Sequence, residues 1–254
     1  MTPRLDLNAD LGEHDGPPPE AARALLRLVT SANIACGTHA GDDRSMRLVS
    51  AEAAALGVQV GAHPAFPDRA GFGRRVMAMR PAEVTDTVAR QIHALSANAM
   101  AEGVAVRHVK PHGALYTLAF RDRATADAIA DAVVLADASL ALYAPGGSAL
   151  AAAGAAACLR VVAEGFLDRA YEDDGALTPR EVPGAVLDDP DAACARALAW
   201  AATGTVRTRT GSAVALPLES LCIHGDSPAA LAIATRVRAA LASAGVRLIA
   251  SLAP

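Results

Sequence analysis

The stretch RHVKPHGALY, residues 107–116, contains Lys110, the single lysine among the 23 lysine and arginine residues of the chain. The lysine side chain ends in a compact ammonium group, and the larger planar guanidinium of arginine cannot replace it where a compact charge is needed. Val106, His108 and Lys110 alternate with Arg107 and Val109, as on the two faces of a β-strand. Pro111 ends the strand because it has no backbone donor. The stretch therefore predicts a strand that delivers Lys110 and His112 together to a functional site.

The order of a short strand, a polar turn and a helix recurs along the whole chain. Strands that alternate with helices form a parallel sheet, which predicts an α/β fold and, at this length, a (β/α) barrel. We expect strands at 4–10, 29–35, 58–62, 106–110, 140–144, 159–163, 221–223 and 246–252, a hairpin at 206–216, and helices at 17–28, 43–56, 81–102, 122–136, 190–202 and from Pro228 onward.

Polar side chains follow at least five of these strands. In (β/α) barrels the functional site is assembled at the carboxyl ends of the strands. Histidines with purely structural roles would not gather in the turns after strands, so this distribution predicts a catalytic site. The residues that we expect to meet at the mouth of the barrel are Asp10, His39, His63, Lys110 with His112, and His224 with Asp226.

Length and charge limit the class of protein. At 254 residues the chain has the length of one barrel, so we expect a single domain over residues 1–254. The net charge of −4, with no basic stripe, argues against nucleic acid as a partner. Residues 138–159 carry no charge, but Pro145 and two following glycines favour a strand, a turn and a buried helix over a membrane span.

The cysteines predict the compartment. Four cysteines are widely spaced, and no pair has the CxxC spacing of a metal or redox motif. We identify no signal peptide and therefore expect reduced, buried thiols in a cytoplasmic protein. The four are Cys36, Cys158, Cys194 and Cys222.

The first predicted strand, RLDLNAD at residues 4–10, alternates apolar and polar side chains. One face of a barrel strand points into the interior, so we expect Asp6, Asn8 and Asp10 inside, where a carboxylate needs a partner or a metal. Asp10, His39 and His63 come from three neighbouring strand ends and would form a hydrolytic metal site with an open position. Without a metal, the same groups would contact a substrate directly.

Six motifs occur in a fixed order: NADLGE at 8–13, SANIACGTHAGD at 31–42, GAHPAFPDR at 61–69, HVKPHGALY at 108–116, LDRAYEDDG at 167–175 and CIHGD at 222–226. Together they resemble the A subunit of 5-oxoprolinase, the LamB/YcsF family, over nearly the whole chain. The chain departs from the family pattern only in small details, at Thr38 and in the turn at 14–16. The resemblance implies a distorted, seven-stranded (β/α) barrel similar to the glycoside hydrolase and polysaccharide deacetylase superfamily.

The resemblance also implies an activity and partners. The activity is ATP-dependent hydrolysis of 5-oxo-L-proline to L-glutamate, and the partners are subunits resembling 5-oxoprolinase B and C. The chain has no GxxxxGK[ST] motif, since Pro111 follows Lys110. ATP with Mg²⁺ would therefore bind a partner subunit or the glycine turn at 145–148, whose backbone amides suit a phosphate. The sequence also allows a homo-oligomer, and it leaves open whether the isolated chain is active.

For such a reaction, a plausible route is phosphorylation of the lactam oxygen followed by attack of water, which needs a cation, a base and an acid. Lys110 is the candidate cation, Asp10 the base and His112 the proton donor. Arg74 would pair with the substrate carboxylate, and Asp168 with Arg169 is expected to be a structural pair. The remaining substrate-binding candidates are Asn8, Asn33, His39, His63 and His224.

Two other functions stay open at this stage. The chain could be a stand-alone metal-dependent deacetylase or amidohydrolase that uses Asp10, His39 and His63. It could also be a non-catalytic subunit that holds the substrate for its partners. A chelator separates the first alternative from the leading hypothesis, and substitution of Lys110 separates the second.

Overall fold

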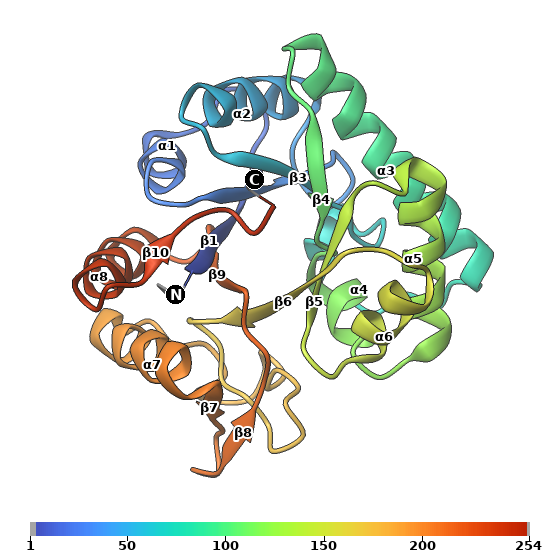
Figure 1. Ribbon diagram of the computed structural model, residues 1–254. Helices are drawn as coiled ribbons and strands as arrows, with labels where there is room; N and C mark the ends of the chain where they lie inside the picture. Colours follow the sequence, from blue (N-terminus) through green and yellow to red (C-terminus); the bar gives the residue numbers. More distant parts are fainter. Residues whose placement is uncertain (1–3, 253–254) are drawn as a thin grey trace.

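Seven parallel strands close into a barrel in the computed structural model, which describes residues 4–252 (Figure 1). The sheet order is β10-β1-β2-β3-β4-β5-β6-β9, and β1 also pairs with β9, which closes the ring. This closure confirms the expected seven-stranded barrel. The strands are β1 Arg4–Leu11, β2 Ser31–Ala35, β3 Gln59–His63, β4 Val106–Val109, β5 Ala141–Pro145, β6 Val161–Phe166, β9 Ser220–His224 and the short β10 Arg247–Leu248.

Helices surround the barrel on its outer side (Figure 1). Their starts follow local chemistry: Asp42 caps α2 by accepting from the Ser45 amide, and Pro81 occupies the first turn of α3, where its missing donor is not needed. The sequence did not predict α4, which begins directly after His112. The helices are α1 Glu20–Leu26, α2 Asp43–Ala55, α3 Pro81–Ala101, α4 Gly113–Leu118, α5 Arg123–Asp137, α6 Ala149–Ala156, α7 Pro190–Thr203 and α8 Ala230–Ser243.

Both faces of β1 are buried: one face carries apolar side chains and the other carries polar side chains. Leu7 and Ala9 belong to the apolar core between the strands and the helices. Asp6, Asn8 and Asp10 alternate with them and are at most 2% exposed. Because successive side chains of a strand point to opposite faces, these three polar groups lie inside the barrel, as expected.

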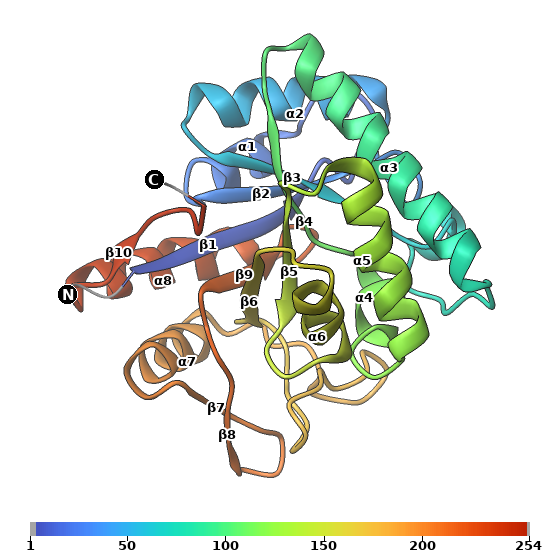
Figure 2. The same cartoon turned by 45° about the vertical axis from the view of Figure 1, so that its right-hand side comes forward.

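The chain between β6 and β9 departs from the regular pattern. Residues 168–187, here called the cap, fold back on themselves through bridges between Arg169 and Val186 and between Tyr171 and Leu177. The cap is followed by α7 and by a hairpin of β7 (Thr205–Arg207) and β8 (Ala213–Ala215). Figure 2 shows this hairpin projecting from the barrel near α7.

The uncharged run at 138–159 forms β5, a turn and α6, as expected, and no described helix is both long and apolar enough to cross a membrane. The expectation of four buried cysteines is wrong at one position. Cys158 is exposed, whereas the other three cysteines are buried. The reason is its place in the surface turn after α6, where its backbone has a left-handed φ of 59°.

Candidate active site

Lys110 forms a buried ion pair with Asp10 at the carboxyl end of the barrel. Its Nζ lies 2.5 Å from Asp10 Oδ1, 3.2 Å from Cys222 Sγ and 3.8 Å from Glu164 Oε1. Burial alone would lower the pKa of Lys110, but the Asp10 carboxylate raises it well above its usual value. Burial likewise opposes ionisation of Asp10, yet His63 and Lys110 hold its pKa well below the usual range. Both groups are therefore charged.

A network of hydrogen-bonded polar side chains, deeper inside the barrel, holds this ion pair in position. Asn33 Nδ2 donates to Asp10 Oδ1 at 2.9 Å and to Asn8 Oδ1 at 2.7 Å. Asn8 Nδ2 in turn donates to Glu164 Oε1 at 2.9 Å and to Ser220 Oγ at 2.7 Å. Asn8 and Asn33, which we expected to bind substrate, thus lie beneath the cavity and position its acids. Strand alternation places them inside the barrel but does not give their depth.

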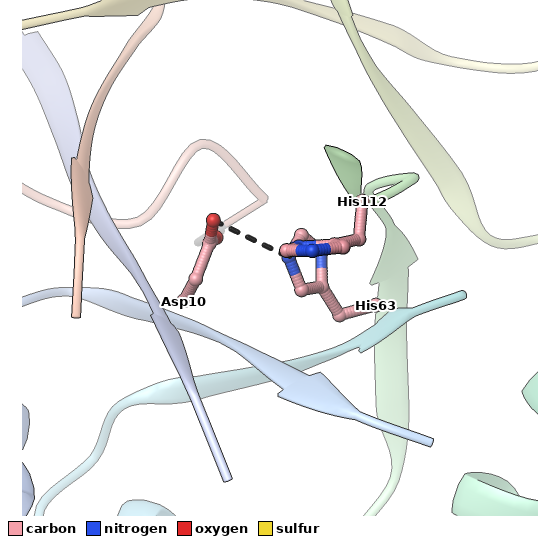
Figure 3. A group of neighbouring side chains, drawn as sticks. All are labelled: Asp10, His63 and His112. Atoms are coloured by element: carbon pink, nitrogen blue, oxygen red, sulfur yellow. Dashed lines mark hydrogen bonds and ion pairs between the residues drawn. The ribbon is translucent and has the colours of Figure 1, made fainter. Parts of the chain in front are cut away.

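The rings of His63 and His112 lie nearly perpendicular to each other beside Asp10, with one nitrogen of each ring directed at the other (Figure 3). His63 Nδ1 lies 2.7 Å from the Lys110 carbonyl oxygen, and His112 Nε2 lies 2.9 Å from that of Phe72. A carbonyl only accepts, so these two nitrogens carry the protons. The remaining nitrogens, His63 Nε2 and His112 Nδ1, are 2.9 Å apart, and Asp10 Oδ2 is 3.3 Å from His63 Nε2. In the neutral rings, two lone pairs therefore point at each other.

Glu13 and His39 place two further possible metal ligands next to this pair. Glu13 Oε1 lies 3.5 Å from His39 Nε2 and 3.6 Å from His112 Nδ1, and it has no hydrogen-bond partner among the described residues. His39 stacks on His112 with ring centroids 4.1 Å apart, and burial lowers its pKa to about 3. Burial also raises the pKa of Glu13 well above its usual value.

The grouping of possible metal ligands differs from the expected set of Asp10, His39 and His63. In the part of the chain that the structure describes, the groups whose donor atoms lie within 4.8 Å of one another are Asp10 with His63 and His112, and Glu13 with His39 and His112. His112 thus replaces His39 beside Asp10, because His39 stacks on it instead. Glu13 was not predicted as a site residue, although the motif NADLGE contains it.

Asp168 orients His224 at the end of β9. Both carboxylate oxygens lie 3.0 Å from His224 Nδ1, and one of them also accepts from the His224 backbone amide at 3.0 Å. Burial opposes ionisation of Asp168, but His224 and its amide lower the pKa of the carboxyl. We expected Asp168 to be a purely structural partner of Arg169. It instead holds one imidazole nitrogen, which leaves Nε2 free to face the cavity.

A cavity of about 400 Å³ opens above these groups. Catalytic and substrate-binding candidates that line it are Asp10, His63, Arg74, Lys110, His112 and His224, whereas Asn8, Asn33 and His39 do not. Arg74 is not free: its Nη2 lies 2.5 Å from Asp226 Oδ2, and its guanidinium lies over the Phe72 ring. The structure therefore brings five of the seven residues expected at the barrel mouth to one cavity and leaves His39 and Asp226 outside its lining.

The model of the LamB/YcsF family matches residues 5–253. The chain belongs to this family. It is 52% identical over 244 residues to the 5-oxoprolinase A subunit of Symbiobacterium thermophilum, covering 96% of this chain and 94% of the relative. For the 5-oxoprolinase A subunit of Methylococcus capsulatus the identity is 51% over 247 residues, with 97% and 95% covered. The crystal structure of the lactam utilization protein from Thermus thermophilus has a TM-score of 0.90 and 47% identity, with 97% and 99% covered.

The site of this LamB/YcsF chain is assembled from the six motifs that carried the resemblance. Each motif contributes a side chain at or beside the cavity, although the motifs lie far apart in the sequence. The charged and imidazole members are Asp10 and Glu13, His39, His63, Lys110 with His112, Asp168, and His224 with Asp226.

Proposed function

We propose that this LamB/YcsF chain is the subunit of an ATP-dependent 5-oxoprolinase that binds 5-oxo-L-proline and opens its lactam ring to give L-glutamate. The observation that carries the proposal is the convergence of a charged lysine, a histidine pair and an Asp168–His224 dyad on one cavity of about 400 Å³. The names of its relatives, at 51% and 52% identity, support the substrate class.

The chemistry requires activation, because resonance stabilises the lactam. The γ-phosphoryl group of ATP moves to the lactam oxygen and ADP leaves; water then adds to the activated carbon and the C–N bond breaks, which leaves an acyl phosphate. A second water molecule hydrolyses this acyl phosphate to the γ-carboxylate of L-glutamate and phosphate. Negative charge develops at the lactam oxygen during these steps. Lys110, buried and charged beside Asp10, is placed to stabilise that charge in surroundings where water screens it little.

We assign proton transfer to His224 in place of Asp10 and His112. Asp10 already accepts from Lys110 and Asn33 and has a depressed pKa, so it is a weak base. His112 holds its proton against the Phe72 carbonyl. His224 donates through Nδ1 to Asp168, so its Nε2 can accept a proton from water, and the carboxylate stabilises the resulting imidazolium. The imidazolium then protonates the departing ring nitrogen.

Asp10, His63 and His112 fit a divalent cation. Their donor atoms lie within 4.8 Å of one another, and the facing lone pairs of the two rings repel unless a positive charge lies between them. Burial lowers the pKa of both imidazoles, which favours a metal ion over a proton at this point. These three residues would hold the ion, which would polarise the lactam carbonyl when bound.

We place ATP and its Mg²⁺ with partner subunits resembling 5-oxoprolinase B and C, because the chain has no phosphate-binding GxxxxGK[ST] loop. Dependence on ATP also favours a cytoplasmic location. A second candidate function, a stand-alone metal-dependent amidohydrolase, is favoured by the grouping of Asp10, His63 and His112.

The test is reconstitution. The chain is mixed with its two partner subunits, 5-oxoproline and Mg-ATP, and glutamate and ADP are measured together for wild type, Lys110→Arg and the surface control His93→Ala. We expect equal glutamate and ADP only in the complete mixture, and a loss of about 100-fold or more for Lys110→Arg alone. Chelator-sensitive amide hydrolysis by the isolated chain would favour the second candidate. Full activity of Lys110→Arg would leave only a substrate-holding role.

A further inference from the structure

Four arginines line the cavity, and three of them have acceptors within the protein. Arg74 pairs with Asp226, and Arg121 pairs with Asp174. Arg169 lies inside the cap, where it donates to two backbone carbonyls. Their charges are therefore compensated or their donors occupied before any ligand enters.

Arg180 differs from these three. Within residues 4–252, no hydrogen bond or carboxylate within 4.0 Å is found for its guanidinium, although the side chain lines the cavity and is partly buried. Burial and the nearby Arg74 charge lower the pKa of Arg180, because both disfavour its cationic form. Partial removal of a guanidinium from water without an acceptor costs free energy, which a bound anion would offset.

The cap holds Arg180 in a defined place. The Val182 amide donates to the Pro179 carbonyl at 3.0 Å, so Arg180 sits within a closed turn. The same cap begins at Asp168, whose carbonyl accepts from the Leu187 amide and whose carboxylate orients His224. Arg180, which lies in the cap, and His224, which lies outside it and is oriented by the cap residue Asp168, therefore face one cavity.

The cavity as a whole attracts negative charge. Five cationic side chains line it. Lys110, Arg74 and Arg121 are paired with Asp10, Asp226 and Asp174, so Arg169 and Arg180 face the one remaining lining carboxylate, Glu181. An excess of one sign in an enclosed site concentrates ligands of the opposite sign. Because Arg74 is engaged with Asp226, the free guanidinium of Arg180 is the stronger candidate to receive such a ligand.

We propose that Arg180 is the anion-binding residue of this cavity and pairs with a carboxylate or phosphoryl oxygen of the bound molecule. The choice between these two oxyanions rests on the proposed function: the carboxylate would come from 5-oxoproline, and the phosphoryl group from the activated lactam or the nucleotide. In either case Arg180, and not Arg74, sets the preference for an acidic ligand.

Calorimetric titration of the full chain tests this proposal with three probes: 5-oxo-L-proline, its decarboxylated analogue 2-pyrrolidinone, and inorganic phosphate. The variants are Arg180→Gln and Arg180→Lys, with Arg121→Gln as a matched cavity-lining control and a thermal melt of each to verify folding. For a carboxylate site we expect Arg180→Gln to weaken 5-oxoproline binding about 10- to 100-fold. Binding of 2-pyrrolidinone should stay unchanged, Arg180→Lys should restore part of the affinity, and Arg121→Gln should have little effect.

The outcomes separate this inference from the proposed function. Loss of phosphate binding alone in Arg180→Gln assigns the residue to a phosphoryl group. Arg180-dependent phosphate binding without any 5-oxoproline binding supports the anion site and counts against the lactam substrate. Equal binding of both anions by wild type and Arg180→Gln, or binding of neither by wild type, overturns the inference.

Discussion

His63 Nε2 and His112 Nδ1 lie 2.9 Å apart, and the other nitrogen of each ring is held by a backbone carbonyl. Two neutral imidazoles in this arrangement direct lone pairs at each other, and Asp10 Oδ2 lies next to the lone pair of His63 Nε2. The contact is favourable only when positive charge occupies the space between them. The arrangement of the two rings alone therefore indicates a cation site, without any comparison to other proteins.

The first prediction concerns that cation. We expect the purified chain to bind about one divalent ion such as zinc, and His63→Ala or His112→Ala to weaken its binding at least about 10-fold. Plasma mass spectrometry after dialysis measures the bound metal directly. His93→Ala is the control, because His93 is exposed on α3. Undiminished metal content in both site variants would contradict the assignment.

Lys110→Met is expected to destabilise the fold by about 3–5 kcal/mol, because it leaves Asp10 and the nearby Glu164 carboxylate buried without their cation. Adding Asp10→Asn should recover part of this loss, since it removes one uncompensated charge. Urea unfolding of wild type, both single variants and the double variant measures the coupling. A cost below about 1 kcal/mol for Lys110→Met would mean that the pair contributes little.

Asp168→Asn keeps the shape of the dyad but removes the charge that would stabilise a protonated His224. We expect kcat to fall about 10²- to 10⁴-fold, with little change in KM, because binding contacts are retained while proton transfer is impaired. Steady-state assays of the reconstituted complex measure both constants. Asp174→Asn serves as the control, because Asp174 lies outside the cavity lining and pairs with Arg121. A change in KM alone would assign Asp168 to binding instead of proton transfer.

The stability of the protein should depend on pH through Asp6, which lies inside the barrel. Four hydroxyls donate to its carboxylate, but burial is the larger effect and raises its pKa above the usual 3.8. As pH rises past 3.8, the unfolded chain loses this proton first, so the contribution of Asp6 to stability falls until the pH passes the raised folded-state pKa. As pH rises above 3.8, the urea-unfolding free energy of wild type should fall relative to that of Asp6→Asn. Parallel curves would exclude this role.

Thiol labelling should report the exposure of a single cysteine. Burial raises the pKa of Cys36 to about 12, and Cys194 and Cys222 are also buried, whereas Cys158 is exposed. Thiolates, not thiols, react with disulfide reagents. We expect one rapidly reacting thiol in the native chain, none in Cys158→Ser, and full labelling of the remaining thiols in urea. Rapid labelling of two or more native thiols would show that the core opens readily.

The sequence predicted the parts of the site that depend on local pattern. Alternation placed Asp10 inside the barrel, and the break at Pro111 placed Lys110 and His112 at a strand end. The helix α4 was missed, because its six residues are too few for a helical period to be recognised. Strand alternation also could not separate Asn8 and Asn33, deep in the barrel, from the side chains at its mouth.

The contacts that sequence reasoning missed are long-range. Asp168 meets His224 across 56 residues, and Glu164 receives the Asn8 amide across 156. Neither carboxylate has a neighbour in sequence that reveals its partner, so only the closure of the barrel brings these groups together. Sequence reasoning also missed Arg180, because its lack of a partner becomes apparent only when the partners of the other cavity-lining arginines are known.

The pairing of β1 with β9 also has a consequence for how the protein is made. Asp6 and Ser220, hydrogen-bonded in the closed barrel, are 214 residues apart, so the ring cannot close until the residues up to and including β9 have left the ribosome. Until then one edge of β1 lacks its neighbour and can pair with other chains. The nascent protein is therefore expected to depend on chaperones late in synthesis, and messages truncated before β9 should yield aggregates in place of a smaller barrel.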